Sequence, residues 1–252
     1  MTLALVALGI FCGCSKSGSG APAPSPSSSN ATSVAAKPAA GTNGSKTNAI
    51  AALNPPEVDP AEQVTQLNNK GTELLDQRKY DEAIAVFNEA KKLNPDDENT
   101  EYNLGIAYAR SGNKEEAIRH YNEALRIFPD YTEAHNNLGN VLLSQGKKEE
   151  AVAQFQASIK TDPDHAMSHN NLGTALGQMG RITEATLEFA KAIQLDPKYI
   201  EAYVNLGNAY LAQGRNEEAV TQFGQALMIR PDFQPAMRGM ARARQGLPGP
   251  VR

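Results

Sequence analysis

An asparagine recurs every 34 residues through most of the sequence, at Asn69, Asn103, Asn137, Asn171 and Asn205. Further asparagines lie one residue before or three residues after members of this series, at Asn136, Asn170, Asn140 and Asn208. A carboxamide has one acceptor oxygen and two donor hydrogens, so it can bond both the N–H and the C=O of a peptide unit. A row of such groups suits an extended peptide backbone of any sequence. We call these nine residues the asparagine ladder.

Signatures of catalysis are absent from the sequence, which contains no G-x-S-x-G, no H-E-x-x-H and no glycine-rich phosphate loop. His165 and His169 are four residues apart and could share a helix face, with Asp162 or Asp164 as a third metal ligand. However, His165 falls at a junction between 34-residue units, and His169 stands where the preceding unit has His135, which favours a packing role. We therefore expect no enzyme, no metal site and no cofactor.

Charge and cysteine content restrict the partners further. The 252 residues include 24 Lys and Arg against 28 Asp and Glu, a net charge of -4. Without a basic surplus to neutralise phosphates, a nucleic-acid partner is not expected. The two cysteines, Cys12 and Cys14, are too close together in the chain to cross-link a fold.

Other residue types share the 34-residue period of the asparagines, and they define the elements that position them. Four series agree over five cycles: glycine (Gly71, Gly105, Gly139, Gly173, Gly207), alanine (Ala83, Ala117, Ala151, Ala185, Ala219), an aromatic residue (Phe87, Tyr121, Phe155, Phe189, Phe223) and proline (Pro95, Pro129, Pro163, Pro197, Pro231). The chain therefore contains five repeats, at 64–97, 98–131, 132–165, 166–199 and 200–233. Positions 1 to 34 below count from the start of each repeat.

Each repeat is predicted to form two helices. A glycine at position 15 ends the first helix, at Gly112, Gly146, Gly180 and Gly214, because glycine adopts the left-handed conformation easily. Acidic residues then favour the start of a second helix through its dipole, and the recurrent proline ends it. Since one helix pair cannot bury both of its apolar faces, neighbouring pairs must stack. The glycine and alanine series mark close helix contacts, and the aromatic series fills the space between units.

This pattern resembles the tetratricopeptide repeat, whose signature is met in the fifth unit by Tyr203, Leu206, Gly207, Tyr210, Ala219, Phe223 and Pro231. The resemblance covers residues 64–233 and implies an all-α, right-handed superhelical solenoid that binds other proteins. The first repeat departs from the signature, because Lys70 replaces the usual leucine, as in an end repeat that faces solvent.

Both ends of the repeat region carry helix signals. Asp59, Pro60 and Glu62 read as an N-cap, a first-turn proline and a capping-box residue, so the first helix is expected to begin near Pro60. Residues 234–245 are predicted to form a capping helix with Met237 and Met240 facing inward and Arg238, Arg242 and Arg244 facing water. The domain is thus expected to span 59–245, and 246–252 to form a flexible tail.

Helical geometry divides the first helix of each repeat into two sides. Positions 4, 7 and 11 point one way, and positions 2, 5, 6, 9, 12 and 13 point the other. The second set, which contains the asparagine ladder, is expected to line one continuous groove. The ladder also resembles the asparagine-lined groove of the repeat domain of O-linked N-acetylglucosamine transferases. An alternative remains open: asparagine at position 6 is common in the family, so descent or helix-end solvation explains it equally well.

The N-terminal residues resemble a bacterial lipoprotein signal. An uncharged run from Thr2 to Phe11 is too short to span a bilayer but long enough for a signal peptide, and it closes on a lipobox-like Phe11-Cys12-Gly13-Cys14. The resemblance implies a signal over 1–14 and a lipid on Cys14. Residues 15–58, dominated by Ala, Gly, Pro, Ser, Thr and Asn, are predicted to be a disordered linker.

The sequence therefore predicts a non-enzymatic module that binds extended segments of partner proteins and is tethered to the bacterial envelope, on the periplasmic face of the outer membrane. If the signal is not processed, the protein is cytoplasmic. Position 5 lacks the Lys and Arg that family members use to bind chaperone carboxylates, which argues against that partner class. A structural scaffold that assembles through its outer face or its ends is the alternative function.

Overall fold

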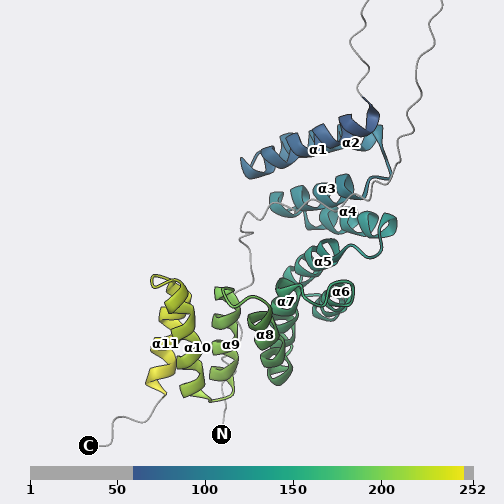
Figure 1. The fold of residues 1–252 in the computed structure, drawn as a ribbon. Coiled ribbons are helices and arrows are strands. Elements are labelled where there is room, and N and C mark those ends of the chain that lie inside the picture. Colours follow the sequence, from purple (N-terminus) through teal and green to yellow (C-terminus); the bar gives the residue numbers. More distant parts are fainter. Residues whose placement is uncertain (1–58, 247–252) are drawn as a thin grey trace, which may run out of the picture. The chain divides into compact units, whose positions relative to one another are not determined.

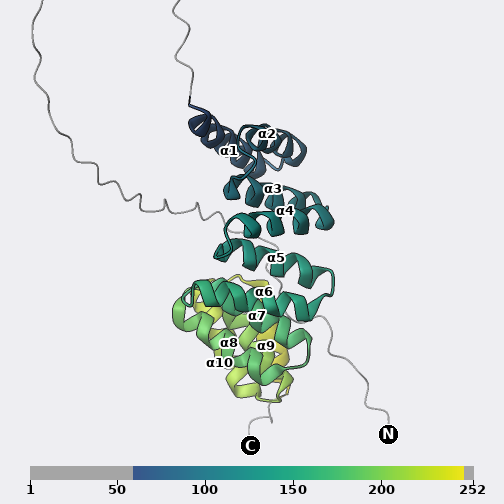
Figure 2. The same cartoon turned by 90° about the vertical axis from the view of Figure 1, so that its right-hand side faces the viewer.

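A computed structural model describes residues 59–246, and this part of the chain is entirely α-helical. The helices follow one another in pairs, and each lies beside its neighbours in the chain (Figure 1, Figure 2). Their bounds are α1 (Pro60–Asp76), α2 (Tyr80–Leu93), α3 (Glu98–Ser111), α4 (Lys114–Ile127), α5 (Thr132–Ser144), α6 (Lys148–Thr161), α7 (Ala166–Gln178), α8 (Ile182–Leu195), α9 (Ile200–Ala212), α10 (Asn216–Ile229) and α11 (Gln234–Gln245).

The helix ends lie where the sequence signals place them. α1 begins at Pro60, and the carboxylate of its N-cap Asp59 accepts a hydrogen bond from the backbone N–H of Ala61 at 3.0 Å. The four position-15 glycines have φ between +75° and +91° in the turns within the helix pairs. In the first repeat the same position is Arg78, which adopts a φ of 61° and is the only non-glycine residue of the described part with positive φ.

The core repeats with the sequence. The five aromatic side chains at position 24 are all 0–2% exposed, and each packs against the glycine at position 8 of its own repeat. A Cβ on Gly139, for example, would lie 2.6 Å from a ring carbon of Phe155. The glycines therefore set how closely the two helices of a pair approach. Lys70, in the first repeat, is exposed as expected, whereas the leucines at its position in the other repeats are buried.

Packing between repeats is asymmetric. Within residues 59–246 the odd-numbered helices of neighbouring repeats contact one another, whereas the even-numbered helices contact only odd-numbered ones. The array therefore curves with the odd-numbered helices on its inner side. We call the surface formed by positions 2, 5, 6, 9, 12 and 13 of these helices the inner face.

Helix α11 covers the end of the fifth repeat, but not with the residues predicted. Its buried side is formed by the small residues Ala236, Gly239 and Ala243, and Gly239 lies against the ring of Phe223. Met240 is half-buried as expected, whereas Met237 is 45% exposed, so its inward placement was wrong. No second helix follows α11 in the described part to cover the side on which Met237 lies.

The predicted signal and lipidated Cys14, the linker at 15–58 and most of the tail lie outside the described residues. Within residues 59–246, no helix has both the length and the apolar character needed to cross a membrane.

Candidate functional site

The asparagine ladder lies on the odd-numbered helices, where adjacent repeats come closest. In three successive junctions the position-6 amide donates to the position-5 side chain of the preceding repeat, always 35 residues back. These bonds run from Asn137 to the Tyr102 hydroxyl (3.0 Å), from Asn171 to Asn136 Oδ1 (2.9 Å) and from Asn205 to Asn170 Oδ1 (2.9 Å). The ladder therefore contributes to cohesion between repeats, a role that the sequence reasoning did not identify.

Burial divides the ladder into two parts. Five members are nearly inaccessible, with exposures of 0–5%: Asn136, Asn170, Asn171, Asn205 and Asn208. In addition, Arg242 of α11 donates to Asn208 Oδ1 at 3.0 Å. Peptide binding through these five amides stays a prediction, and it would require existing hydrogen bonds to open.

The accessible part of the ladder belongs to the first three repeats. Asn69 is exposed, and Asn103, Asn137 and Asn140 are half-buried. Asn69, Asn103 and Asn140 make no side-chain hydrogen bond to the described part of the chain. Their donors and acceptors are thus available to a ligand, whereas Asn137 already uses one donor on Tyr102.

Aromatic side chains adjoin this accessible part. Tyr102 and Tyr131 lie with ring centroids 4.8 Å apart, and Phe128, which is 47% exposed, lies 5.7 Å from Tyr131. The Tyr131 hydroxyl donates to Asn99 Oδ1 at 3.1 Å. Burial raises the pKa values of Tyr102 and Tyr131, so both are neutral hydroxyl groups at physiological pH.

Position 4 carries a second set of polar contacts that the sequence reasoning missed. Its side chain pairs with the residue 19 positions later, on the second helix of the same repeat: Glu101 with His120 at 2.6 Å, His135 with Gln154 at 2.7 Å and His169 with Glu188 at 2.7 Å. The carboxylate of Glu101 also contacts Lys91 Nζ at 2.5 Å and is only 1% exposed. The sequence signal for these contacts was a pair of polar residues 19 positions apart, which recurs in three repeats.

The two histidines considered for a metal have separate partners. His165 precedes α7 and its Nδ1 lies 2.6 Å from the Ser168 hydroxyl, whereas His169 contacts Glu188 and the carbonyl of Pro163. Desolvation lowers the pKa of His165, and the hydrogen bond to Glu188 raises that of His169. No cluster of His, Cys, Asp and Glu suited to a metal ion occurs among residues 59–246.

Comparison with solved structures finds the same fold. The structure reported as "Crystal structure of MamA" matches with 27% identity and a TM-score of 0.58, over 64% of this chain and 94% of that one. YrrB, described as a TPR protein with an unusual peptide-binding site, matches at 21% identity and 0.59, over 73% and 98%. PilF of Pseudomonas aeruginosa matches at 16% identity and 0.63, over 75% and 94%.

Comparison of the sequence with known proteins and protein families identifies the family. No curated protein matches the sequence significantly. One tetratricopeptide repeat family model matches residues 68–132, 102–166 and 136–200, and a second matches 178–244. Together these matches span residues 68–244, which is more than half of the chain and lies within its helical part. The chain belongs to the tetratricopeptide repeat family, whose repeats form protein-interaction modules.

Proposed function

We propose that this protein binds an extended segment of a partner protein along the inner face of its first three repeats, and that it is not an enzyme. The observation that carries the proposal is the state of Asn103 and Asn140, which are half-buried and make no side-chain hydrogen bond within residues 59–246. Each can bond one peptide unit of a ligand through both its donor and its acceptor. Asn137 lies on the same helix as Asn140, and its carbonyl oxygen can accept a further bond.

The groups around these asparagines suit a ligand that is recognised through its peptide backbone. Position 5 is Asn68, Tyr102 and Asn136 in these repeats, so it carries no basic side chain. Neutral amides and hydroxyls recognise peptide units without requiring a particular charge. The peptide-binding site named for YrrB supports the proposal by likeness of fold, although that site is a property of YrrB.

The proposal can be tested with a displayed library of random 12-residue peptides, selected on the full-length protein. Selected peptides should bind the double variant Asn103→Ala, Asn140→Ala more weakly by about 1 to 3 kcal/mol, because two polar partners are lost. Helicity should be unchanged by circular dichroism. Asn122→Ala, which removes an exposed amide on α4, is the matched control and should bind as the wild type does. Equal affinity of all three proteins would refute the site.

We also propose that Cys14 carries a lipid that tethers the module to the bacterial envelope, at the periplasmic face of the outer membrane. The support is the lipobox-like sequence that ends at this residue. Mass spectrometry of the mature N-terminus tests it: a lipidated Cys14 at the first position is expected, and a protein that retains residues 1–13 would overturn the proposal and place the protein in the cytoplasm.

A scaffold that self-associates is the second candidate, favoured by exposed apolar side chains near the end of the array. Met228 is 78%, Met237 45% and Ile229 38% exposed, all on α10 and α11. Exposed apolar surface of this kind often marks a protein contact. Sedimentation separates the candidates, because a stable oligomer that Met228→Ser, Met237→Ser dissociates supports the scaffold and a monomer supports peptide capture.

A further inference from the structure

A cleft lies at the turn end of the first two repeats; it contains no residue of the asparagine ladder, although one of its residues, Arg110, stands at position 13 of the inner face. It has a volume of about 380 Å³ and is lined by Arg78, Lys79, Tyr80, Asp81, Glu82, Arg110 and Ser111. The first five of these residues form the turn between α1 and α2 and the start of α2, and the last two form the end of α3.

The backbone of Arg78 is held in an unfavourable conformation in this cleft. Its φ of 61° matches a position where the other four repeats have glycine. The turn is fixed by hydrogen bonds from Arg78 N–H to the Leu75 carbonyl (3.0 Å) and from Lys79 N–H to the Leu74 carbonyl (2.9 Å). Because a side chain in this region of φ costs energy that glycine avoids, the arginine does not serve the turn itself.

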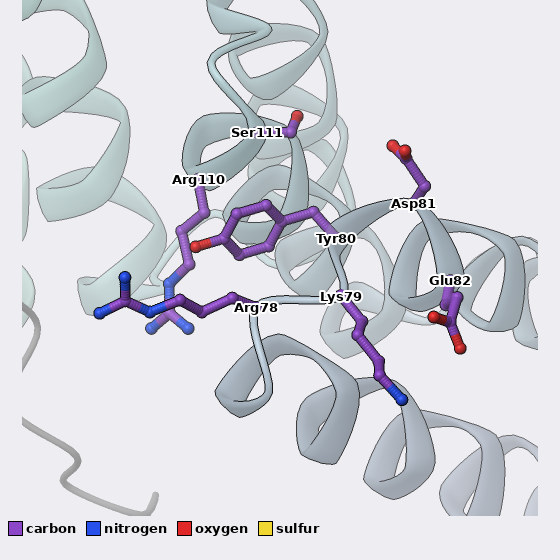
Figure 3. Close-up of a pocket in the computed structure, with 7 residues that line it drawn as sticks. All are labelled: Arg78, Lys79, Tyr80, Asp81, Glu82, Arg110 and Ser111. Atoms are coloured by element: carbon purple, nitrogen blue, oxygen red, sulfur yellow. The ribbon is translucent and has the colours of Figure 1, made fainter.

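The two arginines of the cleft lie apart from its carboxylates. Figure 3 shows the guanidinium groups of Arg78 and Arg110 and the hydroxyl of Tyr80 on one side, whereas the carboxylates of Asp81 and Glu82 and the ammonium group of Lys79 lie on the other. Within residues 59–246, Arg78 forms no ion pair.

Arginines in the corresponding turns of later repeats behave differently. Arg181 and Arg215, one position further along the repeat, are each bonded to a glutamate three residues ahead, Glu184 and Glu218. Their charge is neutralised within the repeat, while that of Arg78 is directed into the cleft.

We propose that this cleft binds the carboxylates of an acidic peptide segment. Guanidinium groups pair with carboxylates through two parallel hydrogen bonds, and the Tyr80 hydroxyl adds a third donor. Arg78 and Arg110 are exposed to solvent, so each ion pair contributes little. A segment with several carboxylates therefore fits the site better than a single small anion.

The probe is acetylated tetraglutamate amide, titrated into the ¹⁵N-labelled full-length protein at low salt and followed by NMR. The backbone amides of Arg78, Tyr80 and Ser111 should shift, and the shifts should disappear in about 0.5 M salt because exposed ion pairs are screened. Affinity should fall about 3-fold in Arg78→Gly and about 10-fold in Arg78→Gly, Arg110→Gln. Arg78→Gly introduces the residue that four repeats already carry, so misfolding does not explain a loss of binding.

Two controls complete the experiment. Arg181→Gln removes an exposed arginine from a distant turn and should leave the affinity unchanged. The double variant Asn103→Ala, Asn140→Ala should also bind tetraglutamate normally, which separates this cleft from the peptide site of the proposed function. The inference is overturned if the arginine variants bind as the wild type does, if the shifts map elsewhere, or if inorganic phosphate binds as tightly as tetraglutamate.

Discussion

The ring of Phe155 occupies the space in which a side chain on Gly139 would lie, with its Cε1 carbon 2.6 Å from the position of a Cβ. The ring is fully buried and cannot move aside. We therefore expect Gly139→Ala to destabilise the protein by about 1 to 3 kcal/mol, because α5 and α6 must separate. Urea unfolding followed by circular dichroism measures the effect.

Gly224 provides the matched control for this substitution. It also lies inside a helix, α10, but a Cβ there would meet only Met240 Cε at 3.8 Å. Gly224→Ala should stabilise the protein by up to about 1 kcal/mol, since alanine is the better helix former. If both substitutions had the same effect, close packing would not explain the glycine series.

Arg78 offers a test of backbone strain. Arg78→Gly should stabilise the protein by about 0.5 to 1 kcal/mol, because the relief at positive φ exceeds the entropic cost of glycine in the unfolded chain. Conversely, Gly180→Ala should destabilise the protein by about 1 kcal/mol, because φ is +78° there and alanine is strained at positive φ. No atom lies within 4 Å of the added methyl group, so the backbone alone would cause this loss. Thermal unfolding of both variants measures the two changes in stability. A loss of stability in Arg78→Gly would show that its side chain supports the fold.

The helices and their stacking could be predicted because their signals are local and repeated five times. Gly112 and Pro129, for example, each end a helix through their own backbone preferences, so the 34-residue period locates every turn. Which side of α11 is buried depends instead on what packs beside it. Met237 occupies a position that the second helix of the pair covers in the other repeats. No such helix follows α11 among residues 59–246, and Met237 is exposed there.

The state of the asparagine ladder could not be predicted from the sequence for a similar reason. Spacing places Asn103 and Asn205 at the same position and on the same face. Whether the position-6 amide is free or hydrogen-bonded to the preceding repeat depends on the position-5 residue of that repeat and on how closely the neighbouring helices approach. Asn205 meets the buried amide of Asn170, whereas Asn103 finds no such partner because Asn68 bonds Asp97 and Thr100 instead. Similarly, the burial of the Glu101 carboxylate depends on His120 and Lys91, which lie on other helices.

The buried carboxylate of Glu101 should make stability depend on acid pH. Burial alone would raise its pKa, but hydrogen bonds and charges from His120 and Lys91 outweigh burial and lower it below the ordinary 4.5. The ionised form is thus favoured in the folded state, so this contribution to stability is present above about pH 4.5 and is lost as the pH falls further.

Glu101→Gln tests this dependence. The variant should be less stable at pH 7 by about 1 to 3 kcal/mol, because Lys91 and His120 lose an ionised acceptor. Its free energy of unfolding should also fall less steeply than that of the wild type between about pH 5 and pH 3. Urea titrations across this range provide the measurement. Glu123→Gln, at an exposed pair with Arg126, should keep the wild-type dependence, and a parallel decline in all three proteins would rule out the role of Glu101.

Substitutions of Asn205 and Asn103 should separate the structural role of the asparagine ladder from its role in binding. Asn205 and Asn170 are both fully buried, so Asn205→Ala leaves the Asn170 oxygen without its donor and should cost about 1 to 3 kcal/mol of stability. Asn103→Ala removes a half-buried amide that makes no side-chain hydrogen bond within residues 59–246, and it should change stability by less than about 0.5 kcal/mol while weakening peptide binding. Urea unfolding and peptide titration of both variants give the two readouts.

A double-mutant cycle of Asn205→Ala with Asn170→Ala should yield a coupling energy of about 0.5 to 3 kcal/mol. Additive effects would mean that the amide–amide bond does not hold these repeats together, and a large loss of stability in Asn103→Ala would assign that residue to the framework rather than to the ligand.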